Sequence, residues 1–256
     1  MKLASYEIRD VVRSRWVAAY GLFFLALTES LLRFGGGSIH ALVSLVNVIL
    51  LVVPMVGVVF GTMYLYGARD FIEMLLSQPV NRRQLYVGLY AGVAVPLCGA
   101  FLVGTAVPFL IHGIPDPTAF ATLLGAGTLL TLIFVGFAFP IAIGNDERVR
   151  GLALALGAWL LLTLVYDGLV LFVVQAASDY PLEVPAIAMM LVNPVDLARV
   201  FLLMQFDFAA LMGYTGAVFE RFFGGPLGTI VSLTVLLAWA ATPFYLGMRL
   251  FTKKDF

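Results

Sequence analysis

Long apolar stretches separated by short polar breaks constrain this chain more than any other feature of its sequence. A membrane-spanning helix needs about 20 mainly apolar residues, because the hydrocarbon core is about 30 Å thick. Six stretches meet this requirement, and 62% of all residues are hydrophobic, compared with about 45–50% in typical soluble domains. The sequence therefore predicts an all-α, polytopic membrane protein. The expected spans are residues 16–32, 39–66, 85–111, 118–143, 151–175 and 226–250.

The breaks between these stretches contain residues that end helices. "FGGGS" follows the first stretch, "HGIPDP" the third and "GNDERVR" the fourth, and glycine, proline, asparagine and aspartate are typical of such stops. Ahead of the first stretch, "ASYEIRDVVRSRW" mixes acidic and basic residues over a helical period, which is unlike the basic start of a cleavable signal peptide. The single cysteine, Cys98, lies in an apolar run and is expected to serve packing. These features predict an unprocessed chain of six spans.

Basic residues predict the orientation, since lysine and arginine in short loops are retained on the cytoplasmic side. Twelve of the 15 fall at one end of the predicted bundle. They are Lys2, Arg9, Arg13, Arg15, Arg69, Arg82, Arg83, Arg148, Arg150, Arg249, Lys253 and Lys254. Both termini are therefore expected in the cytoplasm, in the plasma (inner) membrane. The formal net charge is zero, so nothing indicates a nucleic-acid partner.

One short segment between the second and third spans, "GARDFIEMLLSQPVNRR" at residues 67–83, has an amphipathic pattern. Its apolar residues follow a helical period and its polar residues occupy the other face. Pro79 is expected to end this helix, and Asn81 to cap the next one with Gln84 in a capping box. Two interpretations remain: a helix anchored among lipid headgroups, or a docking surface for a cytoplasmic protein. The docking candidates are Arg69, Asp70, Phe71, Glu73, Met74, Leu75, Gln78, Arg82 and Arg83.

The order of these residues resembles the coupling helix of ABC-2 type transporter permeases, which docks into a separate cytoplasmic ATPase. Residues 1–15 resemble the amphipathic elbow helix of that family, and residues 178–225 resemble its long outer segment between the last two spans. Within the family, "GLALALGAWLLLTLVYDGLVLF" (151–172) and "LVNPVDLARVF" (191–201) are similar to the permease subunits of nitrous-oxide-reductase maturation transporters. The resemblance covers the whole chain.

This resemblance implies a transport subunit rather than an enzyme. The chain contains no G-x-x-x-x-G-K-[ST] sequence that would hold nucleotide phosphates, so ATP and magnesium are expected on a partner ATPase. Six spans are half of the usual exporter core, which implies a homodimer. The alternatives are a different cargo, such as a lipid, peptide, ion or drug, and a secondary transporter, which would normally show two related halves with buried midplane charge. An intramembrane enzyme is disfavoured by the absence of H-E-x-x-H and G-x-S-x-G.

A few ionisable residues fall within the apolar spans, where they are costly and tend to face the protein interior or a cavity. Glu29 and Arg33 stand four positions apart and predict a self-neutralising pair. Tyr166 and Asp167 lie near the expected outer end of the fifth span. Together with Glu29 they are candidates for an outward pathway or for a bond across a dimer, against a purely structural role.

The segment 178–225 is expected outside the membrane as a docking surface for a soluble periplasmic or extracellular partner. The docking candidates are Met190, Asn193, Asp196, Arg199 and Met204. Met189, Met190, Met204 and Met212 also suggest copper, because thioethers bind Cu(I), but their irregular spacing favours an interface, and no metal site is expected. The resemblance implies a β-helix partner and a sulfur-containing cargo for copper-cluster assembly.

Overall fold

The computed structural model describes residues 15–176, 183–205 and 226–254. Within these ranges all regular structure is helical. The predicted elbow helix at residues 1–15 therefore lies outside the described residues, apart from Arg15. The same holds for 177–182 and 206–225, which make up much of the predicted outer segment.

Six helical segments are long and apolar enough to cross a membrane, which confirms the predicted spans. They are α2 (Arg15–Phe34), α3 (Ser38–Gly67), α5 (Arg82–His112), α6 (Pro117–Gly144), the continuous run of α7 (Arg148–Leu160), η1 (Leu161–Val165) and α8 (Tyr166–Ala176), and α12 (Pro226–Lys253). Among the described residues, three shorter helices connect them: α4 (Arg69–Leu76), α9 (Glu183–Val192) and α10 (Pro194–Gln205). The structure therefore has the helical membrane architecture that the sequence predicts.

Two of the spans, α5 and α6, begin after residues that cap them. The Asn81 side chain accepts a hydrogen bond of 3.0 Å from the backbone N–H of Arg83 at the start of α5, as predicted. Asp116 accepts hydrogen bonds from the N–H groups of Thr118 and Ala119 at the start of α6. These N–H groups have no partner within the helix, so a side-chain oxygen there stabilises the helix start. Hydrogen bonding to them lowers the pKa of the Asp116 carboxyl.

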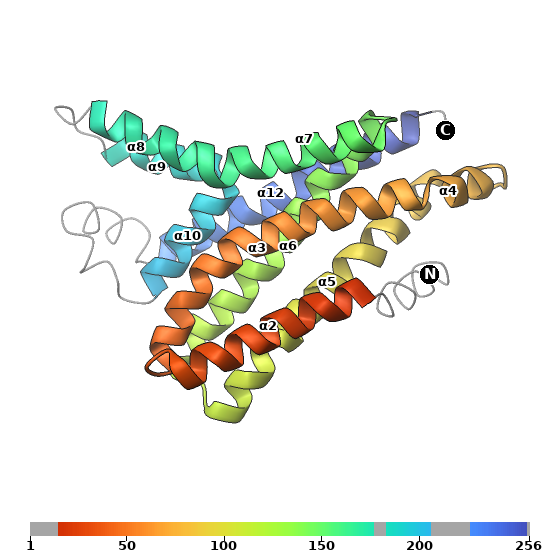
Figure 1. Ribbon diagram of the computed structural model, residues 1–256. Helices are drawn as coiled ribbons and strands as arrows, with labels where there is room; N and C mark the ends of the chain where they lie inside the picture. The colour runs from red at the N-terminus through yellow and green to blue at the C-terminus, as the bar shows by residue number, and fades with distance from the viewer. Residues whose placement is uncertain (1–14, 177–182, 206–225, 255–256) are drawn as a thin grey trace.

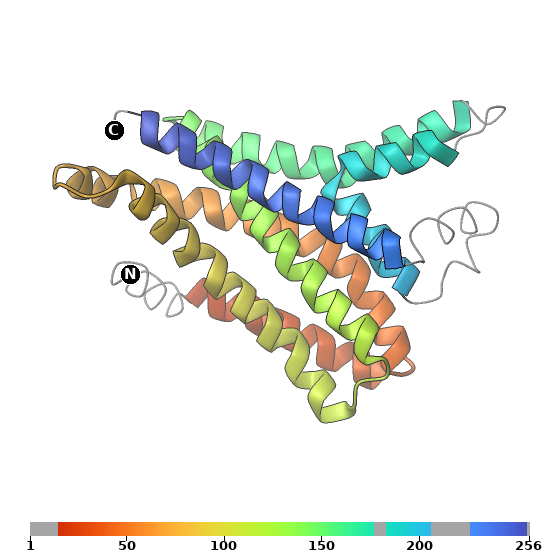
Figure 2. The ribbon, with the colours of Figure 1, turned by 180° about the vertical axis from the view of Figure 1, so that it is seen from behind.

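The α6 helix forms the centre of the bundle. It packs against α3, α5, α7, α10 and α12, and Figure 2 shows it between α12 and α5. Small residues allow the closest approaches: a Cβ added to Gly61 of α3 would lie 2.6 Å from the Cβ of Ala138. Close packing of small residues is typical of membrane helices, where van der Waals contact replaces the hydrophobic effect between helices.

The fifth span is the least covered part of the bundle. It changes direction at the π-helical turn η1, beyond which α8 runs away from the other spans and lies beside α9 (Figure 1). Only 6% of its apolar stretch is buried within the chain, compared with 22–67% in the other five spans. This span therefore presents most of its apolar surface outward.

Helices α9 and α10 form a hairpin that folds back among the spans, with Asn193 at its turn. The Asn193 side chain donates a 2.7 Å hydrogen bond to the carbonyl of Leu162, and Trp239 donates one of 3.2 Å to the carbonyl of Leu191. Leu162 and Trp239 lie near the middle of their spans. The turn therefore reaches about the middle of the bundle, and α10 packs against α3, α6 and α12.

The location of 178–225 outside the membrane stays a prediction for the segment as a whole, but in its described part the turn between α9 and α10 lies level with the middle of the spans. Each of the two helices is too short to cross a bilayer, which is why hydropathy places them outside. At this depth, irregular backbone is tolerated where protein surrounds it. The hairpin meets that condition because its polar turn has hydrogen-bond partners from neighbouring helices.

Candidate functional site

The α4 helix lies at one end of the bundle, which we call the α4 end, together with the last residues of α12 (Figure 1). Its predicted apolar stripe divides in two. Ile72 is completely buried, and Leu75 packs partly against the core. Phe71 and Met74 face outward, with 36% and 55% of their surface exposed. One side of α4 is therefore attached to the bundle, while two large apolar side chains remain available to another molecule.

Arg69 connects the start of α4 to the end of α6. Its guanidinium donates hydrogen bonds to the carbonyl oxygens of Ala142 (3.2 Å), Asn145 (2.6 Å) and Asp146 (2.9 Å). Carbonyls at the C-terminus of a helix lack partners within the helix and carry partial negative charge, so a cation there is favourable. The Tyr66 hydroxyl adds a 2.8 Å bond to the Asn145 carbonyl. The junction of α3 and α4 is therefore fixed to the central helix.

The start of α5 and the end of α12 join the same network. Arg82 donates to the carbonyl of Lys254 at 2.8 Å. The Lys254 ammonium in turn donates to the Ile143 carbonyl and to the Asp146 carboxylate, both at 2.6 Å. The hydrogen bond and positive charge of Lys254 lower the pKa of the Asp146 carboxyl. Displacement of α4 is thus resisted by contacts that reach α3, α5, α6 and α12.

Apart from Leu75, which packs partly against the core, the predicted docking residues separate into three groups in the structure. Arg69 and Arg82 bind backbone carbonyls within the chain. The exposed face of α4 and the turn after it carry Asp70, Phe71, Glu73, Met74 and Gln78. Arg83 lies apart from that face, beside α12. The sequence did not identify Tyr66, Asp146 and Lys254 as part of this site. For Asp146 and Lys254, the only available signal was a charged side chain just outside an apolar span.

The second predicted site, at Asp167, forms an ion-pair network within the chain. Arg199 of α10 donates hydrogen bonds to the carboxylates of Asp167 of α8 (2.8 Å) and Asp196 of α10 (2.9 Å). Asn193 donates a further bond of 3.1 Å to Asp196, and the Tyr166 hydroxyl donates to the Met189 carbonyl at 2.7 Å. This network holds the α9–α10 hairpin against the fifth span. A role for Asp167 in a pathway or across a dimer stays a prediction.

Asn193 and Asp196 are buried. Within the single chain, their side chains therefore offer little surface to an outer partner. Docking stays a prediction for these two residues, as it does for Arg199, Met190 and Met204. At the end opposite α4, Glu29 and Arg33 form the predicted pair at 2.5 Å, and the His112 ring nitrogen Nε2 lies 3.6 Å from the Glu29 carboxylate.

The fold, with six spans and a short amphipathic helix fixed at one end, is that of a polytopic membrane protein. Comparison with known proteins specifies the class: the sequence model described as ABC-2 family transporter protein matches residues 1–256. The chain therefore belongs to the ABC-2 transporter family.

Two curated relatives are each 26% identical to this chain, and in each comparison 98% of this chain and 97% of the relative are covered. Both are named "Probable ABC transporter permease protein NosY", one from Pseudomonas aeruginosa and one from Stutzerimonas stutzeri. The similarity thus extends over the full length of the relatives.

Proposed function

We propose that this ABC-2 permease subunit works with a separate ABC ATPase, which binds ATP and magnesium and docks on α4. The observation that carries this proposal is the division of α4: Phe71 and Met74 are exposed while Ile72 and Arg69 fix the helix to the bundle. Exposed apolar side chains with charged neighbours are typical of protein interfaces, which have an apolar core and a polar rim. Asp70 and Glu73 form such a rim.

The α4 end is the cytoplasmic end in this proposal. The described basic residues at this end are Arg15, Arg69, Arg82, Arg83, Arg148, Arg150, Arg249, Lys253 and Lys254, in accordance with the retention of basic loops in the cytoplasm. Closure of the ATPase would push on α4, and the Arg69 network would pass this displacement to α3 and α6. Packed helices respond to such a push by rigid-body rotation rather than by continuous bending.

Substitutions on α4 test the ATPase proposal. The variant Phe71→Asp/Met74→Asp should abolish co-purification of the permease with its ATPase while the permease remains inserted in the membrane. Leu75 is unsuitable for this test because it packs partly against the core. Val149→Asp is the matched control, because Val149 is an apolar residue at the same end with 74% of its surface exposed. Unchanged recovery of the complex by the α4 variant would contradict the proposal.

Two copies of the chain would form the transport core, with the fifth span at their interface. The support is the low burial of this span and its exposed residues Leu161, Leu164 and Phe172. In a Cys98→Ser background, Leu164→Cys should form a disulfide-linked dimer in membranes under oxidising conditions. The control is Met63→Cys, since Met63 is an exposed residue of α3. A dimer linked through position 63 but not through 164 would place the interface elsewhere.

The cargo proposed for this transporter is a sulfur-containing species for copper-cluster assembly of nitrous-oxide reductase. Its support is the resemblance of 151–172 and 191–201 to permeases of that system, together with the two relatives named NosY. A host that produces the reductase and the other transporter subunits should assemble the cluster only with an active permease, as measured by the visible absorption of the purified reductase. Normal cluster assembly without the permease would contradict this cargo and favour another one, such as a lipid, peptide, ion or drug.

A soluble β-helix protein is the proposed partner at the opposite end, through Met190, Met204 and the rest of 178–225. Changing Met189, Met190, Met204 and Met212 together to leucine keeps volume and apolarity but removes sulfur ligands. Docking and cluster assembly should both survive this change. Failure of assembly in an intact complex would instead assign metal handling to the methionines.

A further inference from the structure

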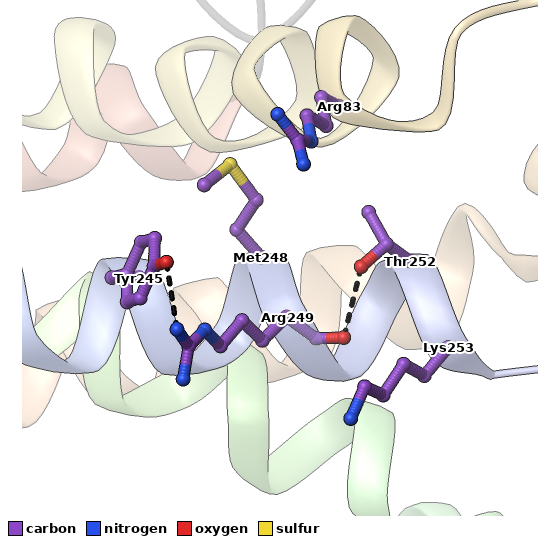
Figure 3. A pocket seen from close by; sticks show the side chains of 6 residues that line it. All are labelled: Arg83, Tyr245, Met248, Arg249, Thr252 and Lys253. Atoms are coloured by element: carbon purple, nitrogen blue, oxygen red, sulfur yellow. Dashed lines mark hydrogen bonds between the residues drawn. The ribbon is translucent and has the colours of Figure 1, made fainter.

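A basic groove lies between α5 and α12 at the α4 end of the bundle. Its volume is about 540 Å³, and its lining consists of Arg83, Tyr245, Met248, Arg249, Thr252 and Lys253. Figure 3 shows Met248 extending from α12 toward Arg83 on α5, with Arg249 beside Tyr245 and Lys253 extending to the other side of α12. We call this feature the α5–α12 groove. None of its three cations takes part in the Arg69 network described above.

The charge of the α5–α12 groove is not neutralised within the described part of the chain. The described ion pairs at this end join Asp146 to Arg69 and Lys254, and none includes Arg83, Arg249 or Lys253. Arg249 is held in place by a 2.9 Å hydrogen bond to the Tyr245 hydroxyl and lies 4.4 Å from the Tyr245 ring centroid. A guanidinium has five N–H donors, so most of those on Arg249 are left for an anion.

The groove begins at the expected level of the lipid headgroups and continues into the apolar layer. Arg83 and Lys253 stand at helix ends, whereas Tyr245 lies eight residues before Lys253, or about 12 Å deeper at 1.5 Å per residue. Exposed apolar residues lie on the same two helices within this depth: Val87 is one helical turn, or about 6 Å, beyond Arg83 on α5, and Leu246 follows Tyr245 on α12. A positive groove with exposed apolar side chains on its two helices suits a phospholipid, whose charged headgroup continues into acyl chains.

We propose that the α5–α12 groove binds an anionic phospholipid, with its phosphate between Arg83 and Arg249 and an acyl chain along Val87 and Leu246. Arginine binds phosphate through two parallel hydrogen bonds, and basic pockets between membrane helices bind anionic headgroups. The exposed side chains of Val87 and Leu246 favour a lipid over free phosphate, because phosphate has no apolar part to bury against them. Because α5 and α12 both contact α6, the bound lipid would also bridge two helices that pack on the centre of the bundle.

Native mass spectrometry of the purified full-length permease tests this site. Binding is titrated with phosphatidylglycerol and, separately, with neutral phosphatidylcholine of the same chain length. The wild type should bind phosphatidylglycerol more tightly. Arg83→Gln/Arg249→Gln should weaken that binding about thirtyfold, the fold-change that corresponds to about 1 kcal/mol for each of two basic residues near the lipid. Arg148→Gln/Arg150→Gln is the matched control, because it removes the same charge from exposed positions at the same end.

A second measurement covers the case in which the groove variant does not fold. Phosphatidylglycerol binding to the wild type should weaken between low and high salt, because salt screens exposed charges, while phosphatidylcholine binding should change little. Equal binding of the two lipids, or an equal loss in the control variant, would overturn the proposal. Displacement of the lipid by millimolar inorganic phosphate would make the groove a free-anion site instead, and displacement by the ATPase subunit would make it a protein contact.

Discussion

Replacing Arg199 by methionine should destabilise the permease strongly, because Arg199 is paired with two carboxylates at once. Its guanidinium lies 2.8 Å from Asp167 and 2.9 Å from Asp196. The Asp196 side chain is 8% exposed, and those of Arg199 and Asp167 are 32% and 34% exposed. Methionine keeps much of the side-chain volume but leaves both carboxylates without their cation. The network is also the main polar contact between α10 and α8.

The size of this effect follows from the burial of the network. Removing one partner of a fully buried ion pair costs about 3–5 kcal/mol. Since two of the three side chains are about one-third exposed, we expect a smaller loss of about 2–3 kcal/mol. In a protein of this size that corresponds to a decrease in Tm of about 5–10 °C. Adding Asp167→Asn and Asp196→Asn to Arg199→Met should recover most of the loss, because no unpaired charge then remains.

Thermal unfolding in detergent, followed by tryptophan fluorescence, measures this difference. Arg33→Met is the matched control: it makes the same substitution in the Glu29 pair, where the arginine side chain is 64% exposed. An exposed pair is worth about 0.5 kcal/mol, so Tm should fall by only about 1–2 °C. Equal decreases in the two single variants, or no recovery in the triple variant, would refute the reasoning that burial decides the cost.

Three further predictions concern helix ends and a close contact. Gly151→Ala should lower stability by about 1–3 kcal/mol, because the added Cβ would overlap the Tyr66 hydroxyl, and adding Tyr66→Phe should restore part of it in the same unfolding assay. Asn81→Ala should cost about 1 kcal/mol through loss of the α5 cap, whereas Asn81→Asp should not. Wild type should be more stable than Asp116→Asn near neutral pH. The pKa of the Asp116 carboxyl is lower in the folded protein than in the unfolded chain. The stability advantage is therefore complete above the unfolded pKa of about 3.9 and should disappear as the pH falls through the folded pKa. A difference in stability that does not change with pH would contradict this prediction.

The spans and caps could be predicted because their determinants are local. Length and hydropathy identify each span within its own residues, and the cap at Asn81 depends on the two residues that follow. The pair of Glu29 and Arg33 is likewise local, since one helical turn separates the two side chains. Each of these features is therefore set by residues that are close together in the sequence.

The contacts of the two sites could not be predicted in the same way. Arg69 binds carbonyl oxygens 73–77 positions further along the chain, and a carbonyl is present in every residue, so no residue type marks the acceptor. Asp167 and Arg199 are 32 positions apart, and only the backward fold of α9 and α10 brings them together. Hydropathy also gave no sign of that fold, because neither helix is long enough to span a membrane.

Site-specific photo-crosslinking tests the central claim, that α4 is the docking surface for an ATPase, most directly. A photoreactive phenylalanine analogue at Phe71 or Met74 in the assembled transporter should crosslink the permease to its ATPase subunit. The same analogue at Val149, an exposed apolar position of α7 at the same end, should give little product. Crosslinks from 71 and 74 that contain only lipid or a second permease, while the complex is intact, would contradict the account.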